Sequence, residues 1–330
     1  MKRIGLLGCG RIGQVHAASV AASARAELAA VFDPFEESAR AVAQAYGAAA
    51  HTSPEPILDD ESIDAVIVAS PTPTHIDLLT RAVQRGKGVL CEKPIDLDLA
   101  RVDACLDELG ELTDRVMLGF NRRFDPSFAD VRARVATGEI GNLEQLTIIS
   151  RDPAAPPAGY VETSGGLFRD MMIHDLDMAR FFLGDVAEVT ALGSNLISPE
   201  IAAAGDVDGA VVTLRSVDGR LATITNSRRC AYGYDQRLEA FGELGALEAR
   251  NQHPTSVRFS GAQATESAPP IHHFFLDRYT PAYRAEFEAF VTALETSEKP
   301  SPGFGDGRAA LVLADAAGES LRTGRTITIG

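Results

Sequence analysis

Short apolar runs alternate with amphipathic stretches over the first 120 residues. The runs cover residues 4–7, 28–32, 65–69, 89–91 and 116–119, and they are almost continuous in apolar side chains. Such runs are typical of parallel strands that are covered on both faces. Residues 36–46 and 75–85 lie between the runs and have the spacing of amphipathic helices. The alternation predicts βαβ units, and therefore an α/β domain with a parallel sheet over residues 1–120.

The pattern changes after residue 120, where alternating apolar and polar positions predominate. Four such segments predict mostly antiparallel strands: 142–151, 210–216, 220–228 and 236–241. Val217-Asp218-Gly219 separates two of them and predicts a hairpin, because Asp-Gly supplies the positive φ of a tight turn. Helical spacing returns at 168–183, 281–296 and 307–322, and the Pro- and Gly-rich stretch 150–166 is predicted to be a loop. We expect an α+β domain with a large open sheet over residues 121–330.

Several of the later strands have apolar residues on both faces. Val211 and Val212, for example, point to opposite sides of one strand. Helices on one face and loops on the other would explain this pattern. We favour a subunit interface on the second face, because an antiparallel sheet with one solvated face alternates more cleanly.

Composition excludes several classes of partner. The formal net charge of −15 disfavours binding to nucleic acid or to an anionic membrane surface. No stretch approaches the length of about 18 apolar residues that a membrane helix needs. The four cysteines form no CxxC pair, which argues against a zinc or dithiol site and fits a reducing cytoplasm. The length of 330 residues favours two domains.

The strongest motif is Gly8-Cys9-Gly10-Arg11-Ile12-Gly13, which directly follows the first predicted strand and precedes a helical segment. In that context GxGxxG predicts a Rossmann dinucleotide site. Gly8 makes the tight turn, Gly10 admits the pyrophosphate, and Gly13 lets the helix pack closely on the strand. The start of the helix then offers N–H groups to the phosphates.

Asp33 stands at the end of the second predicted strand. A carboxylate at this place accepts hydrogen bonds from the ribose hydroxyls and repels a 2′-phosphate. No arginine follows it in Pro34-Phe35-Glu36. The sequence therefore predicts NAD and not NADP, and an ordinary tight turn beside a surface aspartate is a poor alternative.

Glu92-Lys93-Pro94 follows the predicted strand 89–91. It should therefore lie at the carboxyl edge of the parallel sheet, where ligands bind in open α/β folds. Lys93 could hydrogen-bond a substrate hydroxyl, or it could be a solvated surface lysine. Its position alone favours neither interpretation.

Asp170 and His174 are four residues apart in a segment predicted to be helical, so they should share a face. A neutral histidine can accept a hydroxyl proton as hydride leaves, and the aspartate could orient it or bind substrate hydroxyls. A surface Asp–His pair is the alternative. No third ligand at a suitable spacing supports a metal site.

Tyr232-Gly233-Tyr234-Asp235-Gln236-Arg237 brings hydroxyl, carboxylate and guanidinium groups to the start of a predicted strand. Such groups suit recognition of a polyhydroxylated ligand. An exposed turn at a strand start explains them equally well.

Taken together, these motifs resemble the Gfo/Idh/MocA oxidoreductases. The resemblance runs through Gly8–Gly13, Asp33, Glu92-Lys93-Pro94, the stretch 119–125, and Gly165-Gly166 with Asp170 and 174–177. The stretches 149–153, 168–170, 232–237 and 274–279 are most similar to the inositol 2-dehydrogenases of that family.

The resemblance implies roles for particular residues. It implies that Lys93, Asp170 and His174 are catalytic and that these three, with Arg123, Asp152 and Tyr234, contact or border the substrate. We expect the cofactor to be bound by the glycine turn with Arg11 and Ile12, by Asp33, and by Ser70, Thr72, His75, Glu92 and Lys93. The implied reaction is NAD-dependent oxidation of a secondary hydroxyl of a cyclic polyol, with myo-inositol oxidised to 2-keto-myo-inositol. The family also implies a homotetramer built through the second domain's sheet.

Alternatives remain at this stage. Met171-Met172 stands where small polar residues are common in relatives, so another inositol isomer or an aldose is a possible substrate. A few relatives use NAD in redox-neutral glycoside cleavage. A non-catalytic NAD-binding sensor is disfavoured, because loss of catalysis usually removes at least one member of such a catalytic set.

Overall fold

The chain divides into two compact units. The computed structural model describes residues 1–330, except for the side chains of Ala158 and Glu162. One unit comprises Met1–Phe124 and Thr280–Leu311, and the other comprises Asp125–Tyr279 and Val312–Gly330. This division differs from two consecutive segments, 1–120 and 121–330, in the place of residues 121–124 and, above all, of residues 280–311. Phe287, Phe290 and Val291 explain the difference, because they are buried in the core of the first unit.

The first unit contains a six-stranded parallel sheet in the order β3-β2-β1-β4-β5-β6. Its strands are β1 Lys2–Leu7, β2 Ala26–Phe32, β3 Ala49–His51, β4 Ala65–Val68, β5 Gly88–Cys91 and β6 Val116–Leu118. The five predicted strands are confirmed. The pattern missed β3, which has only three residues and lies half exposed at the sheet edge, so it lacks a buried apolar run.

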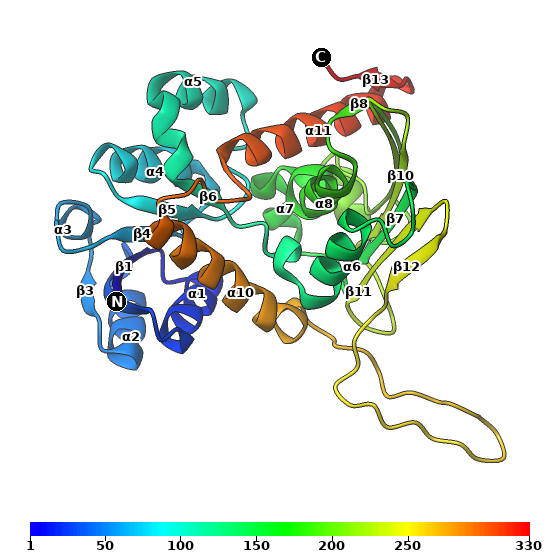
Figure 1. Cartoon of the computed structure of the whole chain (residues 1–330), viewed down its shortest axis with the longest axis horizontal. Coiled ribbons are helices and arrows are strands. Elements are labelled where there is room, and N and C mark those ends of the chain that lie inside the picture. Colours follow the sequence, from blue (N-terminus) through cyan, green and yellow to red (C-terminus); the bar gives the residue numbers. More distant parts are fainter. The chain divides into compact units, whose positions relative to one another are not determined.

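Helices flank this sheet (Figure 1). They are α1 Arg11–Ala22, α2 Glu36–Tyr46, α3 Glu55–Leu58, α4 His75–Gln84 and α5 Leu99–Leu109, with short 3₁₀ turns η1 Thr72–Thr74, η2 Gly110–Arg115 and η3 Asn121–Phe124. Most of α10 Phe275–Thr296 also belongs to this unit. The α/β architecture with a parallel sheet that the first 120 residues predicted is therefore present.

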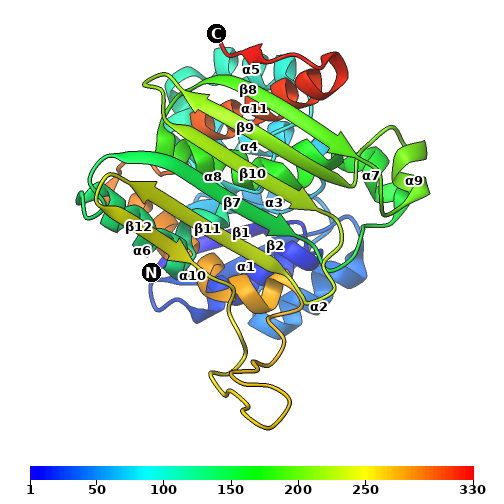
Figure 2. The same cartoon turned by 90° about the vertical axis from the view of Figure 1, so that its right-hand side faces the viewer.

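The second unit contains a seven-stranded sheet in the order β12-β11-β7-β10-β9-β8-β13, seen face-on in Figure 2. Its strands are β7 Leu143–Arg151, β8 Val186–Ser194, β9 Gly209–Ser216, β10 Leu221–Ser227, β11 Asp235–Gly242, β12 Gly245–Ala249 and β13 Ile327–Thr328. Neighbouring strands are antiparallel except β7 and β10, which pair in parallel. The mostly antiparallel sheet and the hairpin at Gly219 are confirmed, whereas β8, β12 and β13 were not anticipated.

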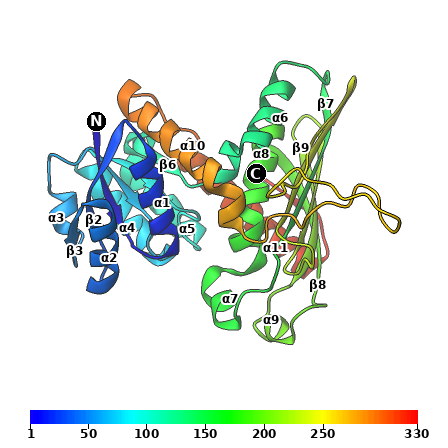
Figure 3. The same ribbon diagram turned by 90° about the horizontal axis from the view of Figure 1, so that it is seen from below.

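Helices α6 Pro126–Ala136 and α8 Ile173–Leu183 cover one face of this sheet (Figure 3). A π-helical segment, η4 Phe168–Met172, leads into α8. The unit also contains α7 Ala158–Ser164, α9 Pro199–Ala203 and the end of α11 Phe304–Thr323. The loop predicted at 150–166 is thus wrong for α7. Pro157 precedes this helix and Gly165 ends it with φ 84°, so the proline and glycine mark the ends of a short helix.

Within the described part of the second unit, no helix covers the opposite face of the sheet (Figure 3). Val211 is 43% exposed there while its neighbour Val212 is fully buried in the core. Leu192, the cross-strand partner of Val211, is also exposed, as are Leu221 and Phe241. The apolar residues on both faces therefore reflect a core on one side and an open surface on the other.

Among the helices that the structure describes, none combines the length and apolar character needed to cross a lipid bilayer.

Candidate active site

The glycine-rich turn after β1 is shaped by contacts that only glycine allows. Gly8 has φ 107°, and a Cβ there would lie 2.6 Å from the carbonyl oxygen of Ala69. A Cβ on Gly13 would lie 2.0 Å from the carbonyl oxygen of Gly8. At Gly10 a Cβ would meet no described atom within 4 Å. The first and third glycines thus pack the turn, and the second borders open space where a diphosphate can approach the N-terminus of α1.

Asp33 is tied directly to this turn. Its carboxylate accepts the backbone N–H of Cys9 at 2.8 Å through Oδ2 and that of Phe35 at 2.9 Å through Oδ1. The residue is 8% exposed. A carboxylate oxygen can accept more than one hydrogen bond, so Asp33 keeps acceptor capacity for ribose hydroxyls while repelling a 2′-phosphate. The turn and Asp33 together fit NAD.

His75 braces the segment that follows β4. Its Nε2 lies 2.8 Å from the carbonyl oxygen of Ser70, and its Nδ1 lies 2.8 Å from that of Pro94. Burial lowers the pKa of His75, although the two carbonyl contacts act in the opposite direction. The side chain is 1% exposed. The structure therefore makes His75 a support that links the backbone at Ser70 with the Pro94 segment.

Glu92-Lys93-Pro94 follows β5 at the carboxyl edge of the sheet, as the sequence predicted. The Lys93–Pro94 peptide bond is cis. His16 Nε2 on α1 lies 2.7 Å from Glu92 Oε1. Gly119, after β6, comes so close that a Cβ there would lie 3.2 Å from Glu92 Oε2. These contacts hold Glu92 in place, and Lys93 follows it as a half-buried side chain.

Arg123 lies in η3, also within the first unit. Its guanidinium Nη2 donates to Asp306 Oδ1 at 3.0 Å, and 6% of its side chain is exposed. The sequence suggested Arg123 as a substrate contact and did not identify Asp306 as its partner. The ion pair fixes the guanidinium in one place.

Asp170 is held by two residues from distant parts of the second unit. The hydroxyl of Tyr160 on α7 donates to Asp170 Oδ1 at 3.0 Å. Arg228, which follows β10, brings Nη1 to 3.6 Å from Asp170 Oδ2. His174 lies in the first turn of α8 and is half-buried. Asp170 and His174 are thus parts of one helical run, with Asp170 in its π-helical portion, a geometry frequent at functional sites.

Gly166, the second glycine before this run, lies against a neighbouring carboxylate. Gly166 has φ 79°, and a Cβ there would lie 2.8 Å from Asp206 Oδ1. Asp206 in turn accepts the backbone N–H of Leu167 at 2.9 Å through Oδ2. Gly166 therefore lets the chain turn sharply into the segment that carries Asp170.

A buried polar network anchors α8 to the sheet. Asp175, next to His174, accepts hydrogen bonds from Ser150 on β7 at 2.6 Å and from Asn226 on β10 at 2.9 Å. The Ser150 hydroxyl oxygen also lies 3.1 Å from Gln236 Oε1 on β11. Asp175 is fully buried. The network fixes the first turn of α8, and hence the position of His174, relative to three strands.

Met171 and Met172 lie between the catalytic candidates and are buried, with Met172 in the core of the second unit. Packing accounts for an apolar side chain at Met172, because a polar group there would be buried among apolar neighbours at a cost in free energy. The structure thus explains this methionine without reference to a substrate.

Asp152 and Tyr234 lie near strand ends. The backbone N–H of Asp152 donates to the carbonyl oxygen of Ser227 at 2.9 Å, which continues the parallel pairing of β7 with β10. Tyr234 is 8% exposed, and its ring meets that of Tyr279 edge-on at 5.9 Å. The structure thus places Asp152 half-buried just beyond the sheet and Tyr234 largely in the interior.

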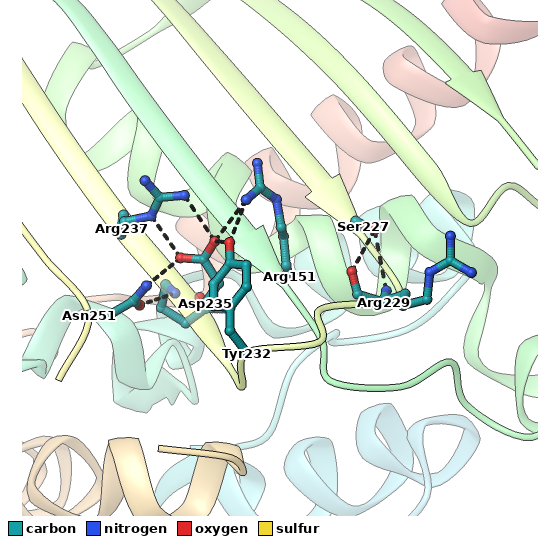
Figure 4. A network of polar contacts seen from close by, with 8 residues as sticks. Arg151, Ser227, Arg229, Tyr232, Asp235, Arg237 and Asn251 are labelled. Atoms are coloured by element: carbon teal, nitrogen blue, oxygen red, sulfur yellow. Dashed lines mark hydrogen bonds and ion pairs between the residues drawn. The ribbon is translucent and has the colours of Figure 1, made fainter. Parts of the chain in front are cut away.

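The cluster around Asp235 has an internal role (Figure 4). Arg237 donates to Asp235 at 2.7 Å, Asn251 at 2.6 Å and the Tyr232 hydroxyl at 2.5 Å. Arg151 adds an ion pair at 3.0 Å. Asp235 is fully buried by these partners. Asp235 and Arg237 are therefore engaged with each other, which favours structural support over ligand recognition for this part of the 232–237 segment.

Sequence reasoning missed Tyr160 and Arg228, the partners of Asp170. Neither has a spacing that relates it to Asp170 along the chain. One signal existed for Arg228. It directly follows β10, as Asp152 directly follows β7, and the structure shows that these two strands pair in parallel, so their ends lie together.

Comparisons with known proteins agree along the whole chain. Residues 2–120 match the model of an oxidoreductase family with an NAD-binding Rossmann fold, and residues 128–248 match the GFO/IDH/MocA C-terminal domain. An inositol 2-dehydrogenase of Rhizobium meliloti (strain 1021) is 49% identical over 99% of both chains. The crystal structure of a myo-inositol dehydrogenase from Corynebacterium glutamicum ATCC 13032 superposes with a TM-score of 0.98 at 55% identity, covering 100% of this chain and 99% of that one.

A more distant structure, scyllo-inositol dehydrogenase from Lactobacillus casei with bound NAD(H) and scyllo-inositol, has a TM-score of 0.90 at 28% identity. It covers 99% of this chain and 99% of that one. The glycine turn and Asp33 lie within residues 2–120, the part of the chain that matches the NAD-binding Rossmann model. The chain therefore belongs to the Gfo/Idh/MocA family of NAD-dependent oxidoreductases.

Proposed function

We propose that the protein oxidises a secondary hydroxyl of an inositol, and that its substrate is myo-inositol, converted to 2-keto-myo-inositol. The observation that supports this proposal most strongly is the helical run that contains both Asp170 and His174. Within it, Tyr160 and Arg228 hold Asp170 in place. The near-complete coverage of relatives named as inositol dehydrogenases supports the substrate class. The choice of isomer rests on the structure at 55% identity, which is named as a myo-inositol dehydrogenase.

His174 is the proposed general base. The O–H bond of the substrate breaks and its proton passes to the imidazole, while the carbon loses hydride and becomes a ketone. Bound NAD supplies the hydride acceptor. Asp170 orients the imidazole or the substrate hydroxyl, and its fixed position between Tyr160 and Arg228 suits that role. Lys93 hydrogen-bonds the reacting oxygen and favours its deprotonation.

Recognition of the remaining hydroxyl groups is proposed for Arg123, Asp152 and Tyr234. These side chains offer a guanidinium donor, a carboxylate acceptor and a phenol, which together match a ring with several hydroxyl groups. The ion pair with Asp306 would keep Arg123 oriented, so little side-chain entropy would be lost on binding.

We also propose a homotetramer that uses the uncovered face of the second unit's sheet. The exposed apolar side chains Leu192, Val211, Leu221 and Phe241 on that face support this assembly. Light scattering coupled to size exclusion would test it. A mass of four chains is expected. Replacing Leu192 and Val211 by Glu should produce smaller species, and an unchanged tetramer would place the interface elsewhere.

NADH formation with a panel of inositols and aldoses tests the reaction. Strong absorbance of NADH with myo-inositol and NAD, and little with NADP, is expected. NADH formation with an aldose but with no inositol would support the dehydrogenase reaction and change the assigned substrate to an aldose. No NADH with any polyol, from protein that binds NAD, would overturn the dehydrogenase assignment.

A further inference from the structure

One fully buried acid in the first unit has no role in the proposed reaction. Glu286 lies on α10 and is 0% exposed. Neither of its carboxyl oxygens has a hydrogen-bond partner among the described residues. Buried carboxylates are normally paired with a cation or with several donors. The burial of Glu286 without such partners calls for an explanation.

The charged group that acts on Glu286 is Glu92, the first residue of the Glu92-Lys93-Pro94 segment. His16, from α1, is a further titratable residue at this place. Its Nε2 contacts Glu92, and its ring meets that of Tyr283 edge-on at 5.6 Å. Tyr283 and Glu286 are three residues apart on α10 and therefore neighbours on its surface. Glu92, His16, Tyr283 and Glu286 thus form one cluster inside the first unit.

The cluster offers a donor for one carboxylate. His16 Nε2 can donate to Glu92 Oε1. Gly119 packs close to the other carboxyl oxygen of Glu92, Oε2. Glu286 has no such donor among the described residues. A second negative charge here would be buried beside the first, which costs far more than keeping a proton on one of the two acids.

We propose that Glu286 keeps its proton in the folded protein at neutral pH, and that this neutral acid is a positioning residue for Glu92 and therefore for NAD binding. When Glu286 loses its proton at alkaline pH, two negatively charged carboxylates lie in the same buried cluster. Their repulsion then displaces Glu92 from His16. The inference concerns the cofactor side alone and does not depend on which polyol is the substrate.

The pKa of Glu286 agrees with this geometry. Burial, and secondarily the charge of Glu92, raise it well above the ordinary value of 4.5. As the pH rises above that value, the unfolded chain releases the Glu286 proton while the folded protein retains it. The folded state therefore loses stability with increasing pH, until the pH passes the folded-state pKa.

The first test compares Glu286→Gln with the wild type in urea unfolding at several pH values. Gln is neutral at every pH, so its stability should not show this loss. Above about pH 5, the unfolding constant of the wild type should therefore rise about tenfold per pH unit relative to that of the variant. Glu288→Gln is the matched control. It is the same change two residues away on α10, at a side chain that is 42% exposed and paired with Arg25. A ratio that does not vary with pH would show Glu286 to be ionised when folded.

The second test measures the dissociation constant for NAD by calorimetry at several pH values from about pH 6 to about pH 10. The wild type should bind NAD about tenfold or more weakly at the alkaline end, and Glu286→Gln should hold its affinity within about twofold. Equal losses in both proteins, or no loss in the wild type, would overturn the positioning role. Glu286→Met, which is uncharged and similar in length, should behave like Gln. If Gln does not fold, Met supplies the comparison. NAD binding is read without any polyol, so failure of the inositol assignment leaves both tests valid.

Discussion

Arg228 and Asp170 form a buried charge pair, with Arg228 Nη1 3.6 Å from Asp170 Oδ2. The same guanidinium brings Nη2 to 3.9 Å from Asp206 Oδ2, and the side chain is 1% exposed. A buried guanidinium requires counter-charges, so the two carboxylates and the arginine stabilise one another. The position of Asp170 is therefore fixed in part by Arg228, a residue more than fifty positions away in the chain.

Replacing Arg228 by Met should lower turnover with myo-inositol by about 100-fold or more, because Asp170 loses its counter-charge and its orientation. Stability should fall by about 3–5 kcal/mol, since two largely buried carboxylates lose a partner. Arg229→Met, at the exposed neighbour, is the control and should change neither quantity appreciably. Full activity in a folded Arg228→Met protein would remove Asp170 from the proposed mechanism.

Replacing His174 by Ala should lower kcat by about 10²–10⁴-fold, the usual contribution of a general base. NAD affinity should change little, because the cofactor turn lies in the other unit of the chain. Steady-state kinetics and NAD titration on the same preparation give the two numbers. Equal losses in turnover and in NAD binding would show that His174 supports structure and does not act as the base.

Replacing Asp33 by Ala should relax the preference for NAD. The carboxylate that would repel a 2′-phosphate is removed, so the ratio of kcat/KM for NAD to that for NADP should fall by about tenfold or more. Asp33→Asn separates charge from shape, because the amide oxygen can still accept a hydrogen bond from Cys9. If neither variant uses NADP, another residue sets the preference.

Asp235 predicts a loss of stability at acid pH. Burial alone would raise its pKa, but hydrogen bonds from Arg237, Tyr232 and Asn251 hold it below the ordinary value of 3.8. Its stabilising contribution is therefore complete above that value and disappears as the pH falls through the lower, folded-state pKa.

Asp235→Asn should destabilise the protein by about 3 kcal/mol at neutral pH, because Arg151 and Arg237 lose their buried partner. The difference from wild type should shrink in acid unfolding below about pH 4. Asp107→Asn, at an exposed position of α5, should have little effect on stability and serves as the control. A neutral-pH stability equal to that of the wild type would contradict the supporting role of this network.

Local signals in the sequence were sufficient for much of the fold and for the cofactor turn. Continuous apolar runs marked five parallel strands because both faces of that sheet are covered, and Gly8, Gly10 and Gly13 marked the turn because their backbone requirements are local. Short or exposed elements such as β3 and α7 have too few buried positions to produce a period.

The spacing of residues along the sequence could not predict which side chains contact one another in the folded chain. Tyr160 and Arg228 contact Asp170 only through the tertiary fold, which also lets the charge of Glu92 act on Glu286. The Tyr232–Arg237 cluster had the composition of a polyol site, yet the pairing of β11 with β7 brings Arg151 onto Asp235. Composition does not tell whether polar groups will satisfy one another or a ligand.

The most direct test of the account is transfer of deuterium from myo-inositol labelled at carbon 2. With NAD as oxidant, the account predicts that the deuterium appears in the reduced nicotinamide by mass spectrometry and that the ketone product carries none. It also predicts a slower rate than with unlabelled substrate when hydride transfer limits turnover. Reduced cofactor without deuterium would place the reaction at another carbon, and turnover without reduced cofactor would contradict the dehydrogenase assignment.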